Sequence, residues 1–304
     1  LRSGRPVSLE NFGCPWRMNL KNARALSGRL WPLSVLVVGL MLANTGMWAQ
    51  STPENSDWPT YGGDLGNTRY RPFDQINASN FNQLEVAWRF KTDNLGNRPE
   101  YKLEGTPLMV NGVLYATGGT RRDVVALDAA TGELLWVHGE HEGERGANAP
   151  RSLSGRGLAY WSDGKESRIL YTTPGYRLIA LDAKTGAYAN GFGDNGNGVV
   201  DLKLHDDQKI DLIHGKIGAQ SAPVVAGNEI LIGAAFLDGA AVTSKTNYKG
   251  YVRAFDVRTG KRAWIFHTVP MKGEFGYNTW LNGSAEYTGN TGLWTQMSVD
   301  EQLG

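Results

Sequence analysis

A short hairpin pattern occurs three times along this chain of 304 residues and constrains the fold more than any other feature. Residues 126–132, 180–186 and 254–260 each run from an apolar stretch into an Asp, with Thr and Gly three and four residues later. The Asp can accept hydrogen bonds from the backbone of a tight turn, and the Gly can take the positive φ that closes the loop. The Asp positions are 54 and 74 residues apart, which suits four-stranded propeller blades with inserted loops better than helical or leucine-rich repeats.

The composition is typical of an all-β repeat protein. The chain has 39 Gly and 10 Trp, as expected for many tight turns and for large aromatic anchors between sheets. Trp136 and Trp264 follow the turn Gly by four residues, and we expect both to be such anchors. Lys and Arg total 31 against 30 Asp and Glu, so the charge gives no electrostatic reason to expect nucleic acid. The single cysteine, Cys14, excludes an internal disulfide framework.

The first 50 residues have the pattern of an export signal preceded by upstream read-through. A basic stretch at 21–29 leads into an apolar run at 30–43, and Met18 lies at a suitable distance upstream to be the true start. The run is shorter than the roughly 20 apolar residues that span a bilayer, which favours a cleaved signal over a permanent anchor. We therefore expect a periplasmic protein folded over residues 51–304, with membrane association through an uncleaved signal as the alternative.

Strand signals fill the rest of the chain. The turn at Asn111 and Gly112 predicts a hairpin within 106–117, because Asn-Gly readily adopts the mirror-image turn. Further strands are predicted at 124–127, 169–173, 178–181, 222–225, 230–234, 251–255 and 263–266. One modest helix is predicted at 77–84, capped by Asn77. The glycine-rich stretch 191–196 spells G-x-G-x-x-G but opens no helix, so we interpret it as a loop.

These strands predict about four blades and a fraction of another after the signal. A propeller has to close on itself, because an open end leaves a strand edge and an apolar blade face uncovered. We therefore expect this chain to be the first part of a longer propeller.

Several further motifs occur in a fixed order, at 57–64, 67–70, 104–108, 156–161, 273–280 and 294–300. Together with the hairpins they resemble the quinoprotein dehydrogenases, eight-bladed β-propellers that bind pyrroloquinoline quinone (PQQ) and Ca²⁺. The similarity is to the branch that contains the glucose dehydrogenases. It implies an all-β fold of four-stranded antiparallel blades, of which residues 51–304 are about the N-terminal half.

The resemblance also implies roles for four residues. Trp294 is expected to be the aromatic surface on which the flat quinone stacks, Arg156 to pair with a cofactor carboxylate, and Glu104 to be a polar contact at the cofactor rim. Asp238 is expected to be a carboxylate on the calcium side. Each has a structural alternative: an interblade anchor for Trp294, a solvated loop charge for Arg156 or Glu104, and a turn cap for Asp238. No catalytic residue is assigned, because the family's general base lies in later blades, beyond Gly304.

By the same resemblance, the expected reaction is oxidation of an aldose or alcohol by hydride transfer to the quinone, with membrane quinone or cytochrome c as the final acceptor. Pro150 and Arg151 occupy positions where relatives that oxidise simple alcohols carry adjacent cysteines, which favours a glucose-like substrate. The alternative function is a cofactor-free periplasmic propeller that acts as an assembly scaffold.

Overall fold

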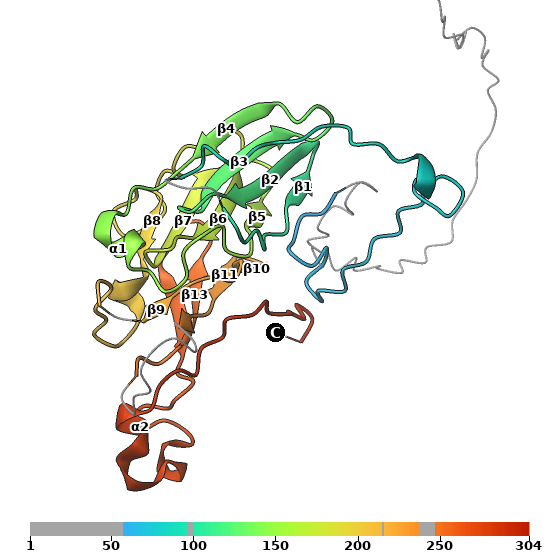
Figure 1. Ribbon diagram of the computed structural model, residues 1–304. Helices are drawn as coiled ribbons and strands as arrows, with labels where there is room; N and C mark the ends of the chain where they lie inside the picture. The colour runs from blue at the N-terminus through green and yellow to red at the C-terminus, as the bar shows by residue number, and fades with distance from the viewer. Residues whose placement is uncertain (1–56, 97–99, 215, 237–246, 304) are drawn as a thin grey trace, which may run out of the picture. The chain divides into compact units, whose positions relative to one another are not determined.

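Three four-stranded antiparallel sheets dominate the computed structural model, which describes residues 57–96, 100–214, 216–236 and 247–303 (Figure 1). The first sheet contains β1 (Leu108–Val110), β2 (Val113–Gly118), β3 (Asp123–Asp128) and β4 (Leu134–His138). The second contains β5 (Ala159–Ser162), β6 (Ser167–Thr172), β7 (Arg177–Asp182) and β8 (Val199–Asp201). The third contains β10 (Val224–Ala226), β11 (Glu229–Ile232), β13 (Val252–Asp256) and β14 (Arg262–Phe266). The expected export signal lies outside the described residues.

Short elements connect these sheets. A two-stranded pair is formed by β9 (Ile217–Gly218) and β12 (Ala235–Phe236). The helical segments are α1 (Gly143–Ala147), α2 (Ser284–Tyr287) and the 3₁₀ turns η1 (Phe81–Gln83), η2 (Leu202–His205), η3 (Tyr277–Thr279) and η4 (Leu281–Gly283). No helix in the described part of the chain is long and apolar enough to cross a membrane. The all-β, four-stranded architecture predicted from the hairpins is confirmed.

Two sequence expectations need correction. The prediction of about four blades is too high for the described residues, because the chain after β14 forms short helical turns and irregular segments and adds no fourth four-stranded sheet. The helix predicted at 77–84 is reduced to the single turn η1. The Asn80 side chain accepts a hydrogen bond from the Asn77 N–H, and the Asn77 side chain accepts one from the Ser79 N–H. Such side-chain bonds to the local backbone compete with helix formation.

The three repeated hairpins adopt one turn geometry. In each turn the Asp Oδ1 accepts hydrogen bonds from the backbone N–H groups two and three residues later and from the Thr hydroxyl, at 2.7 to 3.1 Å. The Gly residues that close the turns, Gly132, Gly186 and Gly260, have φ values of +73°, +70° and +70°. The sequence pattern therefore specifies the turn that follows the third strand of each four-stranded sheet.

A Trp ring from an earlier part of the chain covers the hairpin turn in the first and second sheets. The Trp136 ring in β4 packs on Gly186, and its Nε1 donates to the Ala183 carbonyl at 3.1 Å. Trp88 contacts Gly132 in the same way and donates to the Ala129 carbonyl at 3.1 Å. Trp136 is thus the interblade anchor that the sequence predicts.

The junction between the second and third sheets is built differently. There the Gly193 N–H donates to the Thr259 carbonyl at 2.9 Å, so the glycine-rich loop replaces the aromatic anchor. Trp264, at the equivalent position in β14, donates to Glu229 Oε2 at 2.9 Å and is partly exposed.

The second sheet is buried on both faces. Ile169 and Leu170 are adjacent in β6 and point to opposite faces, because side chains alternate along a strand. Ile169 packs into the core shared with the first sheet, and Leu170 into the core shared with the third. Double-sided burial explains why β6 and β7 read as nearly continuous apolar runs.

Gly186→Ala tests the packing of one sheet on the next. A Cβ at Gly186 would lie 2.5 Å from the Trp136 ring, whereas one at Gly164 would have nothing within 4 Å, and both residues have positive φ. We expect Gly186→Ala to lower the free energy of unfolding by about 1–3 kcal/mol more than Gly164→Ala. Both substitutions strain the backbone, but only the Cβ added at Gly186 collides with the Trp136 ring. Urea unfolding of the full-length protein measures the difference, and equal costs would contradict the packing described.

Asp256→Asn tests the turn carboxylate. Partial burial acts to raise the pKa of Asp256, but the hydrogen bonds from Thr259 and Arg258 outweigh it and hold the pKa below its ordinary value. A lowered folded-state pKa stabilises the protein above the ordinary value and loses that contribution as the pH falls. The stability difference between wild type and Asp256→Asn should therefore narrow as the pH falls below about 4. Urea unfolding at several pH values checks this, with exposed Asp74→Asn as control; a difference independent of pH would contradict it.

Candidate functional site

The segments that lead into the first strand of each sheet are joined by backbone hydrogen bonds. The Thr106 N–H, just before β1, donates to the Arg156 carbonyl at 3.1 Å. The Arg156 N–H, just before β5, donates to the carbonyl of Gln220, just before β10, at 3.0 Å. These links bring residues from all three sheets to one place, although they are far apart in the sequence.

Three of the four predicted site residues lie in or next to these segments. The Arg156 guanidinium carbon lies 5.0 Å from the centre of the Trp294 ring, within the range of a cation–π contact. Glu104 Oε2 accepts a hydrogen bond from Gln220 Nε2 at 2.9 Å, and Glu104 Oε1 pairs with Lys102 Nζ at 3.1 Å. The structure therefore links Glu104 and Arg156 through Gln220 and places Trp294 against Arg156, and the roles implied for the three predicted residues stay predictions. Asp238 lies outside the described residues.

Sequence reasoning missed Gln220, although a positional signal existed. Gln220 precedes β10 much as Arg156 precedes β5, and the two residues are paired through their backbones. Aligning the lead-in segments of successive repeats, instead of only the hairpin turns, would have singled it out.

Some buried polar atoms in the segments around Arg156 and Gln220 have no hydrogen-bond partner among the described residues. They include Arg156 Nε, a charged donor, and the hydroxyl oxygen of Ser221, which follows Gln220. Buried polar groups normally find partners, so each unpaired one needs a reason. Trp294 is 53% exposed, which leaves part of its ring accessible. A cationic donor, a hydroxyl and an indole together suit a flat aromatic molecule with a carboxylate.

The loops that carry these residues are held by one buried arginine. Arg122 is 2% exposed, and burial lowers the pKa of its guanidinium to about 10, so it stays charged at neutral pH. It donates to four backbone carbonyls, those of Leu153, Thr172, Ala219 and Arg151, at 3.1, 2.8, 2.8 and 2.8 Å. Leu153 lies three residues before Arg156, and Ala219 lies directly before Gln220. Arg122 therefore fixes both lead-in segments.

Gly155 makes room for this guanidinium. A Cβ at Gly155 would lie 2.6 Å from Arg122 Nε, and the backbone there has φ of +66°. Both the conformation and the close approach require Gly.

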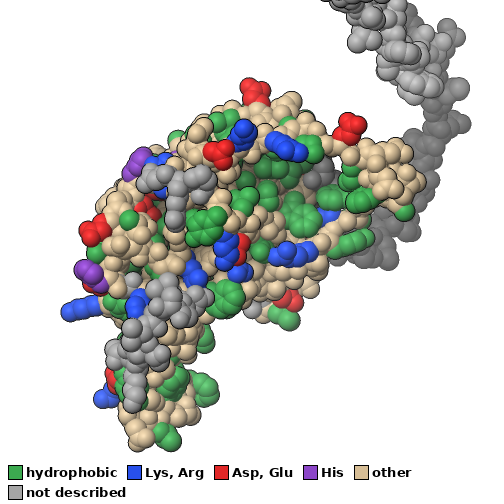
Figure 2. Space-filling view, viewed as in Figure 1, with side chains coloured by type: hydrophobic (Ala, Val, Ile, Leu, Met, Phe, Trp, Pro, Cys, Tyr) green, Lys and Arg blue, Asp and Glu red, His purple; other side chains and the backbone are tan. Residues whose placement is uncertain are grey.

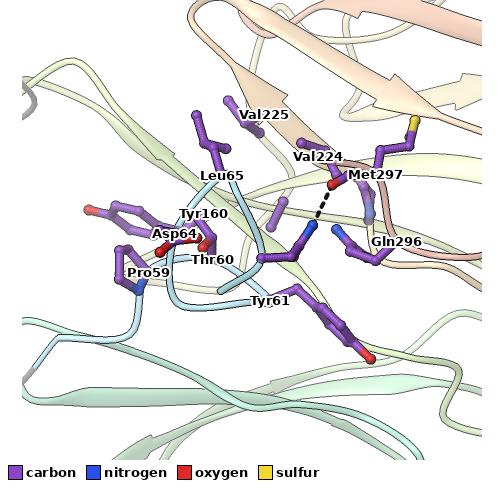
Figure 3. Close-up of a pocket in the computed structure, with 13 residues that line it drawn as sticks. Pro59, Thr60, Tyr61, Asp64, Leu65, Tyr160, Val224, Val225, Gln296 and Met297 are labelled. Carbon is purple, nitrogen blue, oxygen red and sulfur yellow. Dashed lines mark hydrogen bonds between the residues drawn. The ribbon is translucent and has the colours of Figure 1, made fainter. Parts of the chain in front are cut away.

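A small, mostly apolar pocket lies nearby, between residues 59–67, β5, β10 and residues 296–297 (Figure 3). Its walls include Tyr61, Tyr160, Val224 and Met297, and the Asn67 side chain donates to the Met297 carbonyl at 2.7 Å. No arginine or lysine lines it, so it offers no cationic side chain to pair with an anion. By contrast, Figure 2 shows basic side chains among hydrophobic ones near the middle of the visible face.

No group of three or more His, Cys, Asp or Glu within the described ranges is arranged to hold a metal ion.

Comparison with known proteins gives consistent matches. Residues 58–304 match the family model described as "PQQ: Glucose/ethanol/alcohol dehydrogenase, beta-propeller domain". The dehydrogenase subunit of an alcohol dehydrogenase (quinone) from Gluconobacter oxydans is 38% identical over 216 residues, covering 70% of this chain and 25% of the relative. A quinoprotein glucose dehydrogenase from the same organism is 32% identical, covering 70% of this chain and 28% of the relative.

Solved structures agree. The structure of quinohemoprotein alcohol dehydrogenase ADHIIG from Pseudomonas putida superposes with a TM-score of 0.64 and 30% identity, over 82% of this chain and 34% of that one. The chain thus spans about a quarter to a third of the length of the relatives described here.

Arg122→Met tests the support of these loops. The substitution leaves four buried carbonyls without their donor, and breaking a buried charged network of this kind typically costs about 3–5 kcal/mol. Urea unfolding of the full-length protein should show a loss of that size, against a loss below about 0.5 kcal/mol for exposed Arg89→Met. A loss for Arg122→Met as small as that of the control would contradict the role assigned to the guanidinium.

Proposed function

The chain belongs to the PQQ-dependent dehydrogenase β-propeller family, and we propose on that basis that it is the N-terminal propeller segment of a quinoprotein dehydrogenase. The proposed reaction is oxidation of an alcohol or of the anomeric hydroxyl of an aldose. Two electrons pass to PQQ and then to a respiratory acceptor.

One observation carries this proposal. The Arg156 guanidinium lies over the Trp294 ring while its buried Nε lacks a partner, next to the unpaired Ser221 hydroxyl. A buried charged donor without a partner is costly, so a ligand carboxylate that accepts from Arg156 Nε would be favoured. Structural Arg253 also has an unpaired buried Nε, and what distinguishes Arg156 is its contact with the ring of Trp294, which is 53% exposed. A ligand that is both planar and anionic satisfies both groups.

Each residue has a defined task in the proposed site. PQQ, when bound, supplies the quinone carbonyl that accepts the substrate's electrons. Arg156 binds a carboxylate through charge-assisted hydrogen bonds, and the indole of Trp294 covers an aromatic face and keeps water from it. Glu104 only accepts hydrogen bonds when ionised, so it binds a donor at the rim. We assign no residue of this segment to removal of the substrate's hydroxyl proton.

The substrate, metal and compartment are part of the proposal. We propose a glucose-like substrate because, by the family resemblance, Pro150 and Arg151 occupy the positions of a cysteine pair found in relatives that oxidise simple alcohols. Both residues also support the loop before β5. The Arg151 carbonyl accepts from Arg122, and the Pro150 ring lies over Gly218, where an added Cβ would approach within 3.2 Å. We also propose Ca²⁺ with Asp238 among its ligands, a periplasmic location, and membrane quinone or cytochrome c as acceptor.

Replacing Arg156 and Trp294 tests the site in the full-length gene product. Arg156→Ala should weaken PQQ binding by about tenfold to a hundredfold, the usual cost of a hydrogen bond to a charged group. The PQQ affinity of Arg156→Lys should lie between those of wild type and Arg156→Ala, because Lys keeps the charge and loses the planar guanidinium. Trp294→Ala should weaken binding more than Trp294→Phe, which keeps an aromatic face.

Isothermal titration of PQQ into the calcium-loaded apoprotein measures these affinities, with exposed Arg89→Ala as control. Dye-linked oxidation of glucose against ethanol then identifies the substrate class. Unchanged PQQ affinity in both Arg156→Ala and Trp294→Ala would overturn the assignment of the site.

A further inference from the structure

We propose that Gln220 is a positioning residue of the cofactor site, an inference that rests on the proposed function. Its carboxamide orients Glu104, and its backbone carbonyl fixes Arg156. Gln220 thereby couples two groups that contact the cofactor, although it comes from a third sheet.

The geometry places Gln220 between the two residues. Its Nε2 donates to Glu104 Oε2 at 2.9 Å across a sequence separation of 116 residues, and its carbonyl accepts from the Arg156 N–H at 3.0 Å. The backbone just before Gln220 is also fixed, because the Ala219 carbonyl accepts a hydrogen bond from Arg122 at 2.8 Å. These backbone hydrogen bonds fix where the Gln220 side chain starts, and the bond to Glu104 fixes its carboxamide.

The other partner of Glu104 is less able to orient it. The Lys102 side chain is 60% exposed, and the Glu104 side chain is 33% exposed. An ion pair in such a setting is screened by water and contributes about 0–1 kcal/mol. The Gln220 carboxamide is less exposed and approaches the second carboxylate oxygen directly. We therefore assign the orientation of Glu104 to Gln220 and only charge compensation to Lys102.

The chemistry of an amide suits this position. A carboxamide donates a hydrogen bond without adding charge, so the positive charge of Arg156 stays available for an anionic ligand. A carboxylate in its place would repel Glu104, and an aliphatic side chain would leave Glu104 Oε2 without its donor.

A double-mutant cycle in the full-length protein tests the coupling, with PQQ affinity measured by isothermal titration. Gln220→Leu should weaken binding about tenfold, the effect of one hydrogen bond to a charged group. In a Glu104→Ala background, where no carboxylate needs orienting, the same substitution should change affinity less than about twofold. A purely structural role would give equal losses in both backgrounds.

Gln220→Glu separates positioning from packing. The introduced carboxyl matches glutamine in size and keeps the backbone carbonyl, but it can donate to Glu104 only when protonated. Affinity lost near neutral pH should therefore recover, relative to wild type at the same pH, as the pH is lowered toward about 5. A loss that does not depend on pH would overturn the proposal.

PQQ binding by wild type and by Gln220→Leu distinguishes failure of the positioning role from failure of the proposed function. If wild type binds PQQ and Gln220→Leu binds it equally well, the positioning role is wrong and the proposed function stands. If wild type itself does not bind PQQ, the proposed function is wrong and the positioning role with it.

Discussion

A buried, charged guanidinium bonded to backbone carbonyls is the interaction on which the site depends. Burying a charge is costly unless its donors are satisfied, and Arg122 meets that condition with four carbonyls from three segments. The other sheet junction uses the same device. Arg168 donates to the Val257 and Arg258 carbonyls, and buried Arg253 bonds the Leu202 carbonyl, Asp206 and the Tyr176 hydroxyl. These arginine side chains extend between neighbouring sheets and bond to backbone carbonyls of the connecting loops.

The site follows from how these sheets are joined. The second sheet is buried on both faces, so its first strand and the lead-in segment at Arg156 have neighbours on either side. Backbone hydrogen bonds then join Arg156 to the lead-in segments of the first and third sheets. Glu104, Arg156 and Gln220 are thereby brought together from three short segments, each a few residues before a strand, and Trp294 comes from the irregular chain after β14. A site built this way is held by the scaffold rather than by flexible loops.

Local patterns predicted the repeating parts of the fold well. The Asp and Gly of each turn dictate one hairpin geometry, and alternation or apolar runs located most strands, because both signals act over a few residues. The helix predicted at 77–84 is only the turn η1, because the side chains of Asn77 and Asn80 bond to the local backbone. The blade count was too high for the described residues, because the chain after β14 forms no further four-stranded sheet. The grouping of Glu104, Arg156 and Trp294 was anticipated only through family resemblance. Arg122 was missed because its contacts with loops of other sheets leave no periodic trace in the sequence, and Gln220 was missed because only the hairpin turns of the repeats were compared.

A structure of the full-length protein with PQQ bound would test the central claim most directly, namely that three sheets assemble one site for a flat, anionic cofactor. We expect the quinone ring to lie against Trp294, with a cofactor carboxylate bonded to Arg156 and with Gln220 still bonded to Glu104. Finding PQQ elsewhere, with Arg156 Nε still unpaired above an uncovered indole, would contradict it.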